Sequence, residues 1–279
     1  MNSFIIELTN PIDLKWKILY YENMNIMKGA EQIFIDKNSK IGVLMLHGFS
    51  STPKQFEELS VYLVEKGFTV FAPLIAGHGT SPKNLMETSP NDWTESVRKA
   101  YIELKNKSEK IFIIGNSFGS NLGFWLAKEL DNEPAGIITL GAPIFLRFHN
   151  LTKFRLSTYG RFKKYYHKPL RIYKTDFKDI TEEISYDTIP IKSLREFINF
   201  LEKETTPNLH KIKTPILITS SSIDMVVHPK SAKYIFKNIG SLKKEIYWFR
   251  SDKHGVIEQK HKGCQGLFPK IYNFISQNV

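Results

Sequence analysis

Residues 110–130, KIFIIGNSFGSNLGFWLAKEL, join two sequence patterns across a single serine. The continuous apolar run at 111–114 predicts a buried strand, and the apolar residues at helical spacing that follow predict a helix. Between them, Ser117 stands in the motif Gly-Asn-Ser-Phe-Gly. A Gly-x-Ser-x-Gly motif at a turn from strand to helix is typical of a nucleophile elbow, in which the serine hydroxyl projects above the sheet. The context therefore favours a nucleophile over a serine that only caps a helix.

Strands and helices alternate on both sides of this motif. Thr52-Pro53-Lys54-Gln55 and Ser89-Pro90-Asn91-Asp92 each predict the start of a helix with a capping box. The alternation predicts an α/β fold with a mostly parallel sheet that helices cover on both faces. The predicted strands are 41–48, 68–73, 110–115, 135–143, 215–221 and 245–249, and the predicted helices are 52–66, 89–107, 117–131, a helix after Pro229, and 264–278.

The alternation is interrupted between residues 144 and 206. This segment is rich in aromatic and basic residues, and we predict that it forms a helical cap insertion across the carboxyl edge of the sheet. The predicted organisation is an N-terminal extension at 1–30, a core formed by 31–143 together with 207–279, and a cap insertion at 144–206.

A serine hydroxyl needs a base that takes its proton and an acid that orients the base. In a fold with a nucleophile elbow, the acid and then the histidine follow the serine, each in a loop after a strand. Asp224 and His254 each follow a predicted strand, so we predict them as acid and base. Asp252 is an alternative acid but is poorly placed to reach a ring two residues away. His261 is an alternative base, although we expect it to enter the last helix.

The tetrahedral intermediate of acyl transfer needs two N–H donors for its oxyanion. The backbone N–H of Phe118, directly after the serine, is one candidate donor. The second is expected from the loop after the first strand, where Phe49 follows His47-Gly48. Both phenylalanines would donate through the backbone, so we predict that their side chains line the acyl pocket and bind substrate.

Composition restricts the possible partners. The chain carries 39 basic and 28 acidic residues, a net charge of +11, yet only seven of the basic residues are arginine. Arginine is favoured for recognition of phosphates and base edges, and no nucleic-acid-binding motif is present, so we expect no nucleic-acid partner.

No apolar run approaches the roughly 18 residues of a membrane span, and no signal peptide is recognisable. We expect a cytoplasmic protein whose basic cap makes at most weak contact with anionic lipid.

Six segments resemble α/β-hydrolases, and among these the bacterial carboxylesterases and monoacylglycerol lipases. The resemblance implies an α/β-hydrolase fold with a small cap, a catalytic triad of Ser117, Asp224 and His254, and an oxyanion hole formed by the backbone N–H groups of Phe49 and Phe118. It implies neither a cofactor nor a metal. The segments are VLMLHGFSSTPKQF (43–56), GHGTSP (77–82), SPNDW (89–93), GNSFG (115–119), IDMVVHP (223–229) and KHGVI (253–257).

The expected activity is hydrolysis of short- to medium-chain acyl esters or monoglycerides through an acyl-enzyme. Phe118 stands where many relatives carry serine or methionine, which predicts a narrow acyl site. A thioesterase or acyltransferase would use the same triad. An aminopeptidase would need acidic residues that hold the substrate amine, for which Glu182 and Glu183 are candidates, and a ligand-binding protein would use the pocket without turnover. A dehalogenase is excluded, because that chemistry requires aspartate in place of Ser117.

Overall fold

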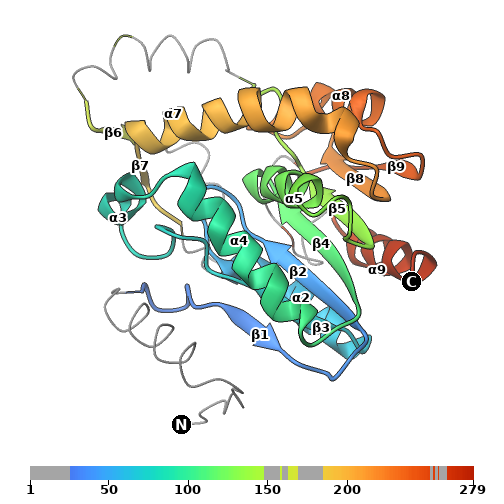
Figure 1. Ribbon diagram of the computed structural model, residues 1–279. Helices are drawn as coiled ribbons and strands as arrows, with labels where there is room; N and C mark the ends of the chain where they lie inside the picture. The colour runs from blue at the N-terminus through green and yellow to red at the C-terminus, as the bar shows by residue number, and fades with distance from the viewer. Residues whose placement is uncertain are drawn as a thin grey trace.

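The computed structural model describes residues 26–147, 158, 163–168, 185–251, 254, 257 and 263–279 (Figure 1). Most of the predicted N-terminal extension, residues 1–25, lies outside these ranges. The described end of that extension packs on the core. The backbone N–H of Met27 donates to the carbonyl of Gly79 over 2.8 Å, and Ala30 is fully buried.

A seven-stranded sheet forms the centre of the fold, in the order β1-β3-β2-β4-β5-β8-β9. Neighbouring strands are parallel except for β1 and β3, so the predicted mostly parallel sheet is confirmed. The short edge strand β1 was not predicted. The strands are β1 (Ile33–Ile35), β2 (Ile41–Leu46), β3 (Thr69–Ala72), β4 (Lys110–Asn116), β5 (Gly136–Leu140), β8 (Ile216–Ser221) and β9 (Lys244–Phe249).

Helices cover both faces of this sheet because its central strands are apolar on both sides. Along β2, Val43 and Met45 pack in one core cluster with α2 and α9, whereas Leu44 and Leu46 pack in another with α4 and α5, as the two-residue period of a strand requires. No helix in the described part of the chain is long and apolar enough to cross a membrane. The helices outside the predicted cap insertion are α2 (Glu57–Glu65), α3 (Pro82–Glu87), α4 (Pro90–Lys105), α5 (Phe118–Glu129), α8 (Lys230–Asn238) and α9 (Leu267–Gln277).

The two predicted helix starts differ in the structure. At α4 the capping box is present, and the Ser89 backbone N–H donates to the Asp92 carboxylate over 2.8 Å. Before α2 the chain forms a 3₁₀ turn at Pro53–Phe56, and the Thr52 side chain makes no capping hydrogen bond. The capping box predicted at Thr52 is therefore wrong, and Gln55 at its expected closing position makes the hydrogen bonds described below.

The predicted cap insertion contains more than helices. A two-stranded antiparallel sheet, β6 (Tyr165–His167) and β7 (Thr188–Pro190), leads directly into α7 (Ile191–Phe200). The chain continues through a π-helical and a 3₁₀ segment, Leu201–Lys211, back to the core. Figure 1 shows α7 lying across the molecule beyond α4 and α5, both of which contact this part of the chain. Other cap aromatics, Phe148, Phe154, Phe162 and Tyr173 among them, lie outside the described residues.

Two buried histidines hold the loops after β2 and β3 together. The Nε2 atom of His47 accepts from the backbone N–H of Ile75 at 3.1 Å, and Nδ1 of His78 donates to the Ala76 carbonyl at 3.0 Å. Their ring centroids are 5.1 Å apart. Burial lowers the pKa of both, His78 to about 4 and His47 well below its ordinary value, the latter also because of the neighbouring His78. Both rings are therefore neutral in the folded protein at pH 7.

This pair makes folding sensitive to acid. Between about pH 6.5 and pH 4 the unfolded chain protonates His78 and the folded chain does not, so the free energy of unfolding falls as pH falls, by up to about 1.4 kcal/mol per pH unit for each histidine. Urea unfolding at pH 7.5, 6 and 5 measures this loss. His78→Gln should be less stable at pH 7.5 but lose less stability on acidification. An equal pH dependence of the free energy of unfolding in the unmodified chain and in His78→Gln would contradict the lowered pKa of His78.

Candidate active site

Ser117 occupies a strained turn between β4 and α5. Its φ of 50° and ψ of −119° lie outside the usual regions for a residue with a side chain. A Cβ on Gly119 would lie 1.8 Å from the Leu46 carbonyl oxygen on β2, and one on Gly115 would lie 2.3 Å from the Ser120 nitrogen. Side chains at both glycines would thus collide with the neighbouring strand and helix. The motif forms the sharp turn that a nucleophile elbow requires.

Three loops bring the predicted triad residues together. The Nε2 atom of His254 lies 2.8 Å from Ser117 Oγ, and its Nδ1 atom lies 2.7 Å from Asp224 Oδ2. The three residues follow β4, β8 and β9, strands whose carboxyl ends meet at one edge of a parallel sheet. The His254 side chain is 14% exposed and that of Asp224 only 5%. The alternatives Asp252 and His261 lie outside the described residues.

Asp224 is held in its ionised form. Burial alone would raise its pKa, but the facing His254 and the backbone N–H groups of Val227 and Val226 outweigh burial and hold the pKa below its ordinary value. The two N–H groups donate to Oδ1 at 2.8 and 2.7 Å, which leaves Oδ2 for the histidine. The guanidinium of Arg147 also donates to the Asp224 backbone carbonyl. Because the carboxylate only accepts, the proton of neutral His254 resides on Nδ1, and Nε2 is free to accept from Ser117.

The loop after β2 lies beside the elbow. A Cβ on Gly48 would lie 3.5 Å from the Ser117 Cβ. The Nδ1 atom of His47 donates to the Gly48 carbonyl at 3.0 Å. That carbonyl and the Phe49 N–H belong to one planar trans peptide unit and point in opposite directions, so the His47 ring fixes the direction of the predicted oxyanion donor.

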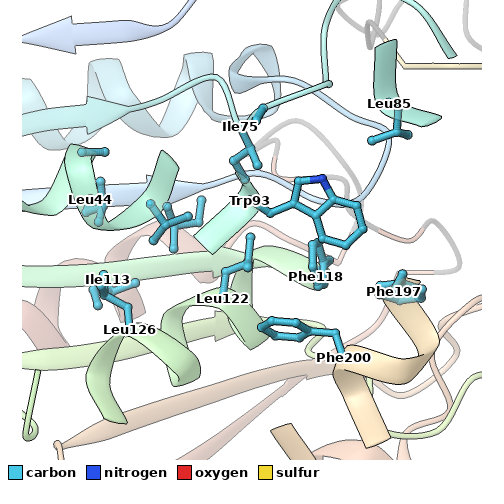
Figure 2. Packing of buried hydrophobic residues seen from close by; sticks show 14 of the residues in the cluster. Leu44, Ile75, Leu85, Trp93, Ile113, Phe118, Leu122, Leu126, Phe197 and Phe200 are labelled. Atoms are coloured by element: carbon cyan, nitrogen blue, oxygen red, sulfur yellow. The ribbon is translucent and has the colours of Figure 1, made fainter. Parts of the chain in front are cut away.

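Aromatic rings fill the space between the elbow and the cap (Figure 2). The Phe118 ring is fully buried, with its centroid 5.5 Å from Trp93, 5.2 Å from Phe197 and 5.4 Å from Phe200. Phe49 stacks on Phe197 at 5.0 Å and is only partly buried. Of the two side chains predicted to line the acyl pocket, only that of Phe49 is accessible, while the Phe118 side chain belongs to the core.

The sequence analysis did not predict that α7 contributes to the aromatic cluster around Phe118. Phe197 and Phe200 have the i, i+3 spacing of one helix face, which was a usable signal, but nothing in their spacing shows which part of the core they meet. It also missed Tyr186, which joins the cap to the loop after β3. The Tyr186 hydroxyl donates to the Gly77 carbonyl over 2.9 Å and accepts from the Thr80 N–H over 2.7 Å.

Within the described ranges no group of three or more His, Cys, Asp or Glu residues could hold a metal ion.

The chain is similar in sequence to two bacterial enzymes. The chain is 31% identical over 234 residues to a thermostable monoacylglycerol lipase of Bacillus sp. (strain H-257), a match that covers 84% of this chain and 90% of the lipase. It is 24% identical over 246 residues to a carboxylesterase of Bacillus subtilis (strain 168), covering 88% and 96%.

The fold matches a solved structure from work on LipS and LipT, two metagenome-derived lipolytic enzymes. The TM-score is 0.80 at 26% sequence identity, and the match covers 91% of this chain and all of the other. The sequence profile of the family described as serine aminopeptidase, S33, matches residues 37–260. The chain therefore belongs to the serine aminopeptidase S33 family and has the α/β-hydrolase fold.

Proposed function

We propose that the protein hydrolyses carboxylic esters, with Ser117 as nucleophile, His254 as general base and acid, and Asp224 as the orienting carboxylate. The observation that carries the proposal is the unbroken pair of hydrogen bonds from Ser117 Oγ through the His254 ring to Asp224. Relatives named as a monoacylglycerol lipase and a carboxylesterase support esters as the substrate class.

Acylation begins when Ser117 Oγ attacks the ester carbonyl carbon and its proton passes to Nε2 of His254. The resulting imidazolium is stabilised by the Asp224 carboxylate. The carbonyl oxygen becomes an oxyanion, which the backbone N–H groups of Phe49 and Phe118 bind. The tetrahedral intermediate collapses as His254 returns its proton to the leaving alkoxide, which departs as an alcohol and leaves the acyl group on Ser117.

Deacylation repeats these steps with water in place of serine. His254 takes a proton from the water as its oxygen attacks the acyl carbon, and the same two N–H groups bind the second oxyanion. Collapse releases the carboxylic acid and returns the proton to Ser117. Each oxyanion donor contributes roughly 3 to 4 kcal/mol of transition-state stabilisation in hydrolases of this chemistry, so the placement of Phe49 adds a substantial share of the rate beside that of the triad.

Three other functions use part of the same site. A thioesterase needs the same residues and differs in its leaving group, so competition between ester and thioester substrates distinguishes it. An acyltransferase also needs the same residues but differs in its acceptor, so formation of a new ester with an added alcohol distinguishes it. An aminopeptidase needs carboxylates for the substrate amine, and the candidates Glu182 and Glu183 lie outside the described residues. A ligand-binding protein has no need of the strained Ser117 backbone or of the ionised, buried Asp224, which together favour turnover.

Ser117→Ala should remove nearly all ester hydrolysis because no other group supplies the attacking oxygen. We expect kcat to fall by three or more orders of magnitude, with an unchanged circular dichroism spectrum, since the glycines rather than the hydroxyl shape the turn. Steady-state kinetics with p-nitrophenyl butyrate measure this loss. Activity within tenfold of the unmodified chain would rule out Ser117 as nucleophile.

Asp224→Asn should lower kcat by about three orders of magnitude, because an amide that donates to His254 favours the wrong tautomer. The pKa of Asp224 is held below its ordinary value, so the unmodified carboxylate stays charged in neutral and mildly acidic solution. The defect should therefore persist at every pH from 5 to 9. Asp252→Asn is the matched control. If it proves the more damaging of the two, the acid has been misassigned.

Acyl-chain length should have an optimum at about four to eight carbons. Each methylene that fits contributes up to about 0.8 kcal/mol. Phe49, in the loop beside Ser117, stacks on Phe197, and we propose that this pair limits the length of the acyl site. The kcat/KM values of p-nitrophenyl esters from two to sixteen carbons measure this profile. Phe49→Ala should move the optimum to longer chains, whereas Phe236→Ala, on α8, should not. A profile still rising at sixteen carbons would contradict a narrow pocket.

A further inference from the structure

The side chain of Gln55 connects the two segments that carry the proposed oxyanion donors. Its Oε1 atom accepts from the backbone N–H of Gly48 at 3.1 Å and from Nδ2 of Asn116 at 3.1 Å. Gly48 directly precedes Phe49 in the loop after β2. Asn116 is the last residue of β4 and directly precedes Ser117. One amide oxygen therefore bridges the two halves of the oxyanion site.

The bridge lies where the sheet no longer holds these segments together. The registered pairing of β2 with β4 ends at Leu46 and Gly115, so the residues that follow are no longer paired with each other, although Asn116 still pairs with Leu140 of β5. Asn116 is only 1% exposed and Gly48 is buried, so their two donors cannot turn to bulk water. A buried donor that loses its acceptor is costly, and the loop would have to shift to recover a partner.

Gly48 is thereby fixed on both sides. Gln55 holds its N–H, and His47 Nδ1 holds its carbonyl, which belongs to the same peptide unit as the Phe49 N–H. The second donor, the Phe118 N–H, lies two residues beyond Asn116. The Gln55 oxygen thus links the two segments that carry the Phe49 and Phe118 donors, while the His47 ring holds the carbonyl of the first donor's peptide unit.

We propose that Gln55 is a positioning residue that, through Gly48 and Asn116, keeps the two oxyanion donors at the separation the transition state requires. The inference rests on the proposed ester hydrolysis. It predicts that loss of the Gln55 oxygen weakens binding of the oxyanion without weakening binding of the substrate, because the proposed effect passes through Gly48 and Asn116.

The test replaces Gln55 by methionine, which has similar length and cannot bridge two N–H donors. We expect Gln55→Met to lower kcat by 10- to 100-fold with KM changed less than threefold. The second readout is the preference for an oxo ester over the matching thiono ester, in which sulfur replaces the carbonyl oxygen. Sulfur accepts hydrogen bonds weakly, so a misplaced donor pair should reduce this preference by a similar factor. Glu65→Met, an exposed position on α2, is the matched control and should change neither readout.

Asn116→Leu tests the bridge from its other end, and remains available if Gln55→Met does not fold. It should lower kcat and the oxo preference in the same direction. The double variant should be no more than about threefold worse than the worse single variant, because both remove one shared hydrogen bond. Unchanged oxo preference in the folded single variants, or fully additive losses, would overturn the proposal. If the unmodified chain shows no Ser117-dependent hydrolysis, the proposed function fails instead.

Discussion

The close approach of the turn after β4 to the end of β2 is the constraint on which the rest of the site depends. Gly119 leaves no room for a Cβ against the Leu46 carbonyl, and Gly115 leaves none against Ser120. This packing lets α5 begin at Phe118, immediately after a serine held at positive φ. It also brings Gly48 against Ser117, so one contact places the nucleophile and, beside it, the loop that carries the second proposed donor.

The loops around the turn after β4 are held by side chains that accept hydrogen bonds from backbone N–H groups. Asp224 accepts from Val226 and Val227 in its own loop, while His47 accepts from Ile75 after β3. Gln55 accepts from Gly48 in the same way. Each of these loops lies beyond the end of a strand, where the ladder no longer supplies acceptors. Buried N–H groups must find partners, and these side chains provide them in positions that also orient the reactive groups.

The parallel sheet and the predicted positions of Ser117, Asp224 and His254 could be derived from the sequence because strand ends in such a sheet share one edge. Gln55 could not be assigned correctly. Its spacing from Thr52 fits a capping box, and only the three-dimensional position of Gly48 and Asn116 shows a better partner for its amide. The same limit applies to Phe118, whose neighbours Trp93, Phe197 and Phe200 come from distant parts of the chain. β6 and β7 are each three residues long, too short for a periodic pattern.

We propose that Ser117 is an activated nucleophile, and covalent labelling with a fluorophosphonate tests this reactivity. The reagent phosphonylates a serine hydroxyl whose proton a neighbouring base accepts, with loss of fluoride, so intact-mass measurement reports the adduct and peptide mapping locates it. We expect one adduct per chain, on the peptide that contains Ser117, and very slow labelling when Asp224 is replaced by asparagine. No adduct at a concentration that labels a control serine hydrolase, or an adduct on any other residue, would show that Ser117 is not an activated nucleophile.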